Sequence, residues 1–231
     1  YGGTRGVSVI DVEDPNQATL LETHDLSRDV YSIHAESDRL LAGCDYELRE
    51  YDISNISGGL TQSISLSGYV REIQPDVEGY ILSLGFGGVG RVERNEGDLS
   101  LVYRENTPTP SFQPEFTTLD EDENDVQPSS STRSSVYSAT SLNGTIYLAN
   151  GFNGLGIFEE ESDGLGKAEQ GFPNLGYTSK IQVSSNVLFS ASWENGVIVL
   201  NVEDPDNPSL LGSYNESGYY VSELYWDEAE E

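Results

Sequence analysis

Residues 6–21 read GVSVIDVEDPNQATLL, and residues 196–211 repeat this stretch almost unchanged as GVIVLNVEDPDNPSLL. Each stretch begins with an apolar run, continues with Val-Glu-Asp-Pro and a short polar spacer, and ends in Leu-Leu. A match of this length indicates internal repeats, and the period of a repeat largely determines the architecture. The length of the repeating unit is therefore the first property to establish.

Each unit opens with a strand-like segment whose fourth residue is apolar. These segments begin at Val30, Val70, Val136, Thr178 and Val221. Their apolar landmarks recur at intervals of 40 to 43 residues, with one longer interval of 66, and they are Ile33, Ile73, Ala139, Ile181 and Leu224. One unit therefore spans 40 to 43 residues, and one of the units carries an insertion.

Short strands fill each unit. Up to four segments rich in Val, Ile, Leu and Tyr alternate with Gly-rich or Asp-Pro turns, and they leave no room for an amphipathic helix. The pattern therefore predicts an all-β protein. Four strands in a unit of this length are typical of a β-propeller blade, because stacked blades cover both faces of each sheet.

The two ends of the chain are complementary in this pattern. Tyr1 aligns with Ala191 at the end of a second strand, while the C-terminus follows a first strand. We therefore expect one β-propeller domain over residues 1–231, of five blades with one split between the termini, or of six or seven if the chain is an excised fragment. The expected blades cover residues 30–68, 69–134 with a loop inserted at 107–134, 135–176, 177–218, and 219–231 together with 1–29.

The two VEDP segments, with the Gly-Tyr pairs that precede three of the first strands, resemble the LVIVD repeat of bacterial and archaeal surface proteins. The pairs are Gly68-Tyr69, Gly176-Tyr177 and Gly218-Tyr219. The units from Val70 and Val136 depart from the repeat, because they lack the Asp-Pro turn. The resemblance implies an extracellular or cell-surface β-propeller, and it brings no established catalytic residues.

The composition is strongly acidic. Asp and Glu number 40 against 11 Lys and Arg, which gives a net charge of −29 spread along the whole chain. An even coat of carboxylates suits a protein that stays hydrated in concentrated salt, and a local acidic binding face is the alternative. Nucleic acid is excluded as a partner, since no basic patch exists to contact phosphates. No apolar run is long enough to span a membrane, and the lone Cys44 allows no internal disulfide.

A polar column precedes the apolar landmarks of the first strands, which normally line the axis of a propeller. It consists of Ser32, Glu72, Ser138, Lys180 and Glu223, and the candidate aromatic ring around it includes Tyr69, Tyr177 and Tyr219. These residues predict either a self-satisfied set of channel ion pairs or a site for a small polar ligand at the channel mouth.

Aromatic residues also follow the second strand in several units. Phe86, Phe152 and Trp193 stand beside small turns, and Tyr1 occupies the corresponding position in the split blade. Exposed aromatic side chains on one rim are typical anchors of a protein interface, so we expect at least two of the three to be exposed. The alternative is that each ring packs onto the neighbouring blade.

The insertion carries a weak calcium signal. Asp120, Asp122, Asn124 and Asp125 have the alternate spacing that opens a calcium-binding loop, but Asp125 replaces the usual Gly and Ser131 stands where Glu is expected. Calcium is therefore a candidate cofactor, and a solvated acidic loop is the alternative interpretation.

No Gly-x-Ser-x-Gly elbow, phosphate-binding loop or zinc-ligand spacing occurs in the sequence. The leading hypothesis is a non-catalytic, extracellular interaction or structural module of a salt-adapted prokaryote, with another surface protein or a subunit of a surface assembly as its partner. The alternative is a calcium-dependent hydrolase of the lactonase-like propeller type, with its site at the channel mouth.

Overall fold

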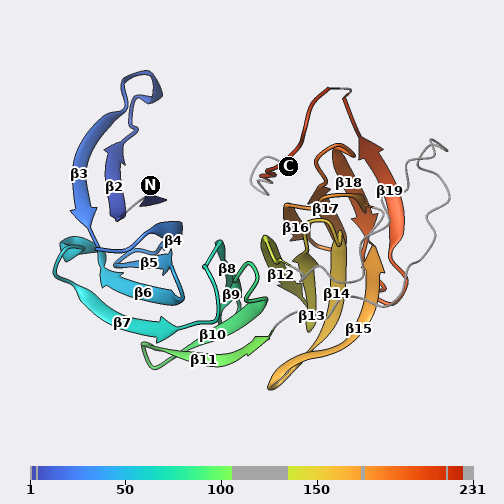
Figure 1. The fold of residues 1–231 in the computed structure, drawn as a ribbon, viewed down its shortest axis with the longest axis horizontal. Coiled ribbons are helices and arrows are strands. Elements are labelled where there is room, and N and C mark those ends of the chain that lie inside the picture. Colours follow the sequence, from blue (N-terminus) through green and yellow to red (C-terminus); the bar gives the residue numbers. More distant parts are fainter. Residues whose placement is uncertain (1, 4, 106–134, 173–174, 217, 226–231) are drawn as a thin grey trace. The chain divides into compact units, whose positions relative to one another are not determined.

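The computed structural model describes residues 2–3, 5–105, 135–172, 175–216 and 218–225 (Figure 1). The chain divides into two compact units, Tyr1–Arg104 and Glu105–Glu231, and each is described by itself. Helical structure is scarce among the described residues, and it includes two 3-10 turns, Pro15–Gln17 and Ile53–Asn55. Neither of these turns is long or apolar enough to cross a membrane.

Unit 1 contains three antiparallel sheets whose strands follow one another in chain order (Figure 1). Blade 1 is three-stranded and consists of β1 (Gly2–Gly3), β2 (Gly6–Asp11) and β3 (Thr19–Asp25). Blade 2 consists of β4 (Val30–Ala35), β5 (Arg39–Cys44), β6 (Glu47–Asp52) and β7 (Leu60–Ser65). Blade 3 consists of β8 (Glu72–Asp76), β9 (Gly79–Ser83), β10 (Val89–Asn95) and β11 (Asp98–Glu105).

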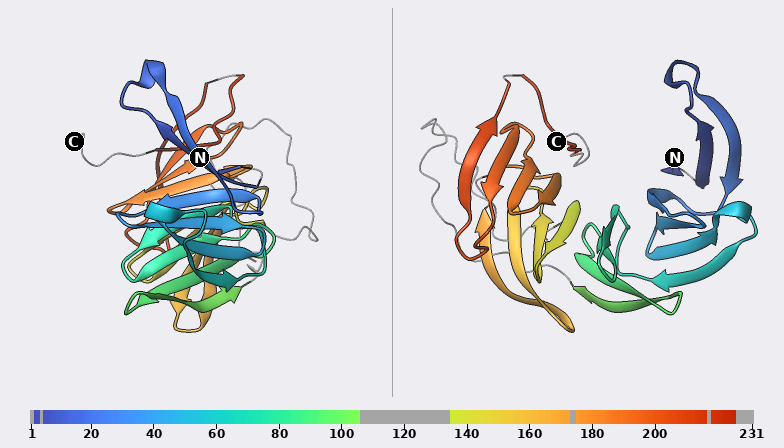
Figure 2. Two further views of the ribbon diagram at one scale, coloured as in Figure 1. Left: turned by 90° about the vertical axis from the view of Figure 1, so that its left-hand side faces the viewer. Right: turned by 180° about the vertical axis from the view of Figure 1, so that it is seen from behind.

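Unit 2 contains two four-stranded antiparallel sheets of the same kind, and Figure 2 shows the twist of their strands from two further directions. Blade 4 consists of β12 (Ser138–Leu142), β13 (Thr145–Ala149), β14 (Leu155–Glu161) and β15 (Gly164–Phe172). Blade 5 consists of β16 (Lys180–Ser184), β17 (Val187–Ala191), β18 (Val197–Asn201) and β19 (Ser209–Tyr214).

The two VEDP repeats fold alike down to their register. Val9 pairs with Glu22 and Ile10 with Leu20, so that a bulge lies between these pairs. Val199 pairs with Gly212 and Leu200 with Leu210, which places the same bulge 190 residues later. The Asp of each Asp-Pro also makes the same turn, because Asp14 accepts the N–H of Asn16 at 3.0 Å and Asp204 that of Asp206 at 3.2 Å.

Apolar side chains fill the space between neighbouring blades of each unit. In unit 1, Leu41 and Leu48 of blade 2 pack in one buried cluster with Leu82 of blade 3. In unit 2, Leu155 of blade 4 shares a cluster with Leu188 of blade 5. Burial between blades therefore holds each unit together, as expected for sheets whose two faces are both apolar.

A glycine lets the inner strands of blades 2 and 3 approach closely. A Cβ on Gly43 would lie 2.2 Å from Ser32 Oγ and 2.7 Å from Val70 Cβ, so a side chain here would collide with both neighbours. The hydroxyl of Ser32 donates to the Val70 carbonyl at 2.7 Å. Gly43 therefore makes room for a hydrogen bond that joins the two blades.

The first strands begin later than the sequence pattern predicts. Strands β8, β12 and β16 each start two residues after Val70, Val136 and Thr178. The reason is that the preceding residues bond to the neighbouring blade instead: the Val70 N–H donates to the Cys44 carbonyl at 3.2 Å, and Thr178 pairs with Gly151.

The first strand predicted from Val221 is wrong over the residues that the structure describes. Up to Tyr225 the segment forms a single bridge, between Val221 and Trp193. Within the described part of unit 2 no strand lies next to this segment, so its backbone has no strand with which to form a ladder of hydrogen bonds. Completion of blade 1 by this segment stays a prediction.

Candidate functional site

The turn between the second and third strands has the same backbone in three blades. Its five residues are 84–88 in blade 3, 150–154 in blade 4 and 192–196 in blade 5. In each, the first residue donates its N–H to the fifth carbonyl at 2.8 or 2.9 Å, and the fourth and fifth residues donate to the first and second carbonyls. The second residue has a positive φ, and it is Gly85, Gly151 or Trp193.

Backbone hydrogen bonds join two of these turns to the segment that follows the fourth strand of the same blade. Gly151 and Thr178 exchange two bonds of 3.0 Å, and Trp193 and Val221 exchange bonds of 3.0 and 3.2 Å. The aromatic side chains of both turns are therefore held beside the tyrosines at residues 177, 219 and 220, which belong to those segments.

The rings of unit 2 form one continuous series of contacts, which we call the aromatic surface. The ring centroids of Tyr137 and Tyr177 are 5.3 Å apart, and those of Phe152 and Tyr177 are 4.7 Å apart. Trp193 lies 4.2 Å from Tyr177 and 5.9 Å from Tyr220. Phe152 is 70% exposed, Trp193 37% and Tyr220 64%. The structure thus joins the predicted rim residues Phe152 and Trp193 with the predicted channel-mouth residue Tyr177.

Unit 1 has a smaller cluster of the same kind around Tyr69. The rings of Tyr31 and Tyr46 each lie 5.3 Å from that of Tyr69, and both are exposed. A hydrogen bond to the Asp45 carboxylate raises the pKa of Tyr31 to about 12, since it stabilises the protonated phenol. Phe86, in the corresponding turn of blade 3, is 60% exposed. All three predicted rim residues are therefore exposed, whereas their role at an interface stays a prediction.

A cleft of about 350 Å³ lies next to Trp193 in unit 2. It is lined by Glu194, Asn215, Gly218, Tyr219 and Tyr220. The side-chain amide of Asn215 donates to the Glu194 carbonyl at 2.7 Å, which fixes the turn against the end of β19. The lining thus combines one carboxylate with two exposed tyrosines and carries no basic side chain.

Two members of the predicted polar column join inner strands to one another. Ser32 donates to Val70, as described above, and the buried hydroxyl of Ser138 donates to the Ile181 carbonyl at 3.3 Å and accepts its N–H. Glu72 and Lys180 are half-buried at the starts of β8 and β16, and Glu223 is exposed. Their ligand role stays a prediction.

The calcium candidates Asp120, Asp122, Asn124 and Asp125 lie outside the described residues. Within the part of the chain that the structure describes, no group of three or more His, Cys, Asp or Glu is arranged to hold a metal ion. Cys44 is fully buried at the end of β5, and burial raises the pKa of its thiol to about 11. A thiol with that pKa stays protonated near neutral pH, so Cys44 is a packing residue.

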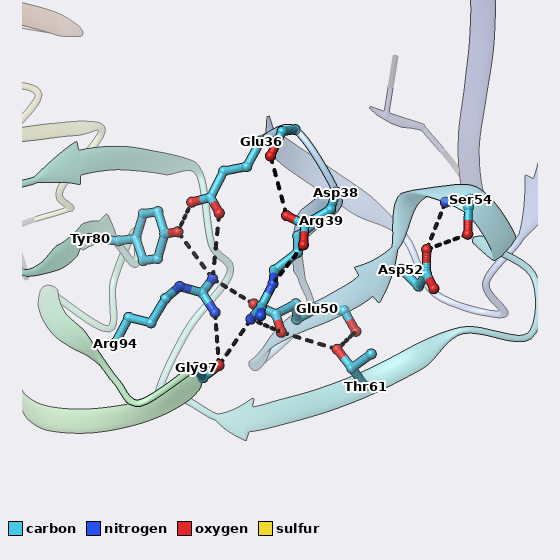
Figure 3. Close-up of polar contacts among 11 residues, drawn as sticks. Glu36, Asp38, Arg39, Glu50, Asp52, Ser54, Thr61, Tyr80, Arg94 and Gly97 are labelled. Atoms are coloured by element: carbon cyan, nitrogen blue, oxygen red, sulfur yellow. Dashed lines mark hydrogen bonds and ion pairs between the residues drawn. The ribbon is translucent and has the colours of Figure 1, made fainter.

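A second cleft, of about 440 Å³, lies between blades 2 and 3 and contains a buried carboxylate (Figure 3). Glu50 is 3% exposed, and it pairs with Arg39 at 3.3 Å and with Arg94 at 2.6 Å. The Thr61 hydroxyl also donates to it at 3.1 Å. Both arginines donate in addition to the Gly97 carbonyl, at 2.9 and 3.1 Å.

This network behaves as a clamp between blades. Its two guanidinium groups are both committed to Glu50 and Gly97, so each charge in the buried core of the network has a partner (Figure 3). Tyr80 donates to Glu36 and accepts from Arg94 at 3.2 Å, and its pKa is raised, mainly by burial. With Tyr80 protonated and Glu50 doubly paired, neither is a ready general base.

Comparison with solved structures identifies the fold. The chain is similar to the WD40 β-propeller domain of Doa1, with a TM-score of 0.64 and 15% identity over 95% of this chain and 65% of that one. It is also similar to the Cps50 (Swd1) β-propeller domain of Myceliophteria thermophila, with a TM-score of 0.63 and 11% identity over 93% and 67%. This chain is a β-propeller.

The β-propeller prediction is therefore confirmed, and blades 2 to 5 are four-stranded antiparallel sheets. The computationally designed Ika4 protein is similar as well, with a TM-score of 0.50 and 12% identity over 76% of this chain and 92% of that one. The chain spans about two thirds of the length of the two natural domains. No family model matches the chain, and no curated protein matches it.

Sequence reasoning missed Tyr46, Tyr220 and Glu50. Tyr46 follows the second strand of blade 2, which is the position that singled out Phe86 and Phe152, so the same signal was present. Tyr220 stands next to the predicted Tyr219. Glu50 pairs with the buried Leu41 across the ladder, and the equivalent residue of the third strand is Arg91 in blade 3, Ile157 in blade 4 and Val199 in blade 5. Because two of these four blades have a charged residue here, the repeat pattern alone does not identify Glu50 as buried.

Proposed function

We propose that this β-propeller is a non-catalytic interaction module that binds a partner protein through the aromatic surface of unit 2. One observation carries the proposal: Tyr137, Phe152, Tyr177, Trp193 and Tyr220 form an unbroken series of ring contacts, in which Tyr137 and Tyr177 are half-buried while Phe152, Trp193 and Tyr220 remain exposed. Tyr and Trp combine a large apolar area with a polar group, and they are enriched where proteins bind one another.

The proposal includes an extracellular or cell-surface location in a salt-adapted prokaryote, with a surface protein or assembly subunit as the partner. The LVIVD-like segments support the location. The 40 carboxylates against 11 basic side chains support the salt adaptation, since screening in concentrated salt reduces their mutual repulsion.

A photo-crosslinking experiment tests the aromatic surface directly. Benzoylphenylalanine is placed at Phe152 in the full chain, produced in its native host, and at Val77 as a matched control. Val77 is 95% exposed and lies in a turn of unit 1, so it does not belong to the aromatic surface. We expect a discrete crosslinked product from position 152 alone. Equal products from both positions, or none from position 152, would contradict the proposal.

The alternative function is a calcium-dependent hydrolase. A site with three or more carboxylate ligands would have to include residues beyond the described part of the chain, because the described part brings no three His, Cys, Asp or Glu side chains together. Turnover of esters, lactones or glycosides that depends on calcium would establish this activity in place of the interaction module.

A further inference from the structure

We propose that the cleft beside Trp193 takes a lysine or arginine side chain from a basic segment of the partner protein. This inference rests on the proposed function, because it names the chemistry that the aromatic surface recognises. The cleft lies where three parts of unit 2 meet: the turn at residues 192–196, the end of β19 and the segment at residues 218–220.

The aromatic lining suits a cation. Tyr219 and Tyr220 line the cleft with rings that are 68% and 64% exposed, and the indole of Trp193 lies 5.9 Å from Tyr220 at an interplanar angle of 71°. Trp and Tyr faces attract a positive charge because their π-systems are electron-rich, and several such faces around one cleft are how quaternary and guanidinium groups are bound.

The charge of the lining favours the same occupant. The Glu194 carboxylate has no ion pair among the described residues, and no basic side chain lines the cleft. The amide NH₂ of Asn215 is used on the Glu194 carbonyl, which leaves its amide oxygen as an acceptor for an N–H donor. A lysine or arginine brings donors and no acceptor, so it complements both groups.

The backbone at Trp193 indicates that the ring belongs to a site. Trp193 has φ +37°, whereas glycine takes this position of the turn in blades 3 and 4, with φ +57° and +58°. A bulky residue in the left-handed region is strained, and such residues cluster at ligand-binding positions. At low ionic strength the net charge of −29 also attracts a basic partner and repels an anionic one.

The test uses the side-chain N–H signal of Trp193 in NMR titrations. Trp226, the other tryptophan of the chain, is first replaced by phenylalanine so that the signal has one source. The probes are the peptides acetyl-Gly-Ser-Arg-Ser-Gly-amide, its lysine analogue and its citrulline analogue, which has nearly the shape of arginine without the charge. Maltotriose and a tetraproline peptide represent neutral occupants.

We expect the arginine and lysine peptides to shift the Trp193 signal in a saturable way. The affinity for the citrulline peptide should be at least ~5-fold lower. Glu194→Gln and Tyr220→Leu should each lower the affinity for the arginine peptide by ~3- to 10-fold. Tyr220→Phe should retain the affinity, because the aromatic ring remains. Tyr225→Leu is the matched control: Tyr225 is 86% exposed and outside the cleft, so its loss should change nothing.

Equal affinity for the arginine and citrulline peptides would overturn the inference, and so would tighter binding of maltotriose or tetraproline. The unliganded Trp193 signal of each variant reports whether the turn has kept its fold. A crosslink at position 152 combined with no response to either cationic peptide would overturn this inference alone and leave the proposed function intact.

Discussion

The ring of Trp193 lies 4.2 Å from that of Tyr177, and Trp193 has a positive φ of +37° at a position that glycine occupies in two equivalent turns. The ring therefore bridges Tyr177, which precedes β16, and Tyr220, which precedes no described strand. A side chain that strains its own turn and still remains 37% exposed supports the proposal that this surface contacts a partner.

Replacing Trp193 separates the strain from the stacking. Trp193→Gly and Trp193→Ala both remove the ring, but only glycine takes the positive φ without cost. We expect the glycine variant to be more stable than the alanine variant by about 1 kcal/mol. Urea denaturation measures both values. An alanine variant as stable as the glycine variant would mean that the turn relaxes and carries no strain.

The sequence predicted the repeating parts of the fold because they depend on local patterns. The two VEDP segments have the same bulge and the same Asp-capped turn. The strand starts were wrong by two residues at Val70, Val136 and Thr178, and at Val70 and Thr178 bonds to the neighbouring blade compete with the strand ladder. Periodicity within one strand holds no information on such bonds between blades.

The candidate site was predicted in parts. Phe152, Trp193 and Tyr177 were identified separately, and the structure brings them into one surface. These three side chains meet because Gly151 pairs with Thr178 and Trp193 pairs with Val221. Such pairs are tertiary contacts, which the pattern within one segment does not reveal. The aligned turns LGFGG, NGFNG and SWENG did contain a usable signal, since they show Trp193 at a glycine position.

The contact at Gly43 should make this position intolerant of a side chain. Gly43→Ala places a methyl group against Ser32 Oγ and Val70 Cβ in the joint between blades 2 and 3. We expect a loss of about 2 kcal/mol in the free energy of unfolding. Gly212→Ala is the control, because a Cβ there meets nothing within 4 Å, and it should be neutral or slightly stabilising. Equal effects of the two substitutions would show that the inner strands are not tightly packed.

The clamp at Glu50 should be sensitive to the loss of one charge. Glu50→Gln leaves Arg39 and Arg94 facing a neutral amide in a site where the carboxylate is 3% exposed. We expect a loss of about 2 to 3 kcal/mol by thermal or urea denaturation, less than for a fully buried pair because both arginines reach solvent. Glu96→Gln changes an exposed carboxylate of the same cleft and should have little effect. A similar loss from both substitutions would contradict the clamp.

The hydrogen bond between Tyr31 and Asp45 predicts a stability loss at high pH. The pKa of Tyr31 is raised to about 12 in the folded chain from an ordinary value near 10, so folding favours the protonated phenol. This contribution is fully present below about pH 10 and is lost as the pH rises through about 12. Titration of the Tyr31 ring carbon by NMR measures the pKa directly. Asp45→Asn should lower it toward 10, and an unchanged value would remove Asp45 as the cause.

Salt should stabilise the folded chain if the acidic coat is an adaptation. Repulsion among 40 carboxylates is unscreened at low ionic strength, so the melting temperature should rise with added sodium or potassium chloride. Four exposed carboxylates from four blades, changed together to amides, give the matched variant: Glu13, Glu78, Asp163 and Glu203. This variant should melt higher than the natural chain at low salt and respond less to added salt. A natural chain whose melting temperature is the same at very low and molar salt would contradict the adaptation. A salt response as large in the variant as in the natural chain would place the repulsion in a local acidic face, since the four substitutions dilute only the dispersed charge.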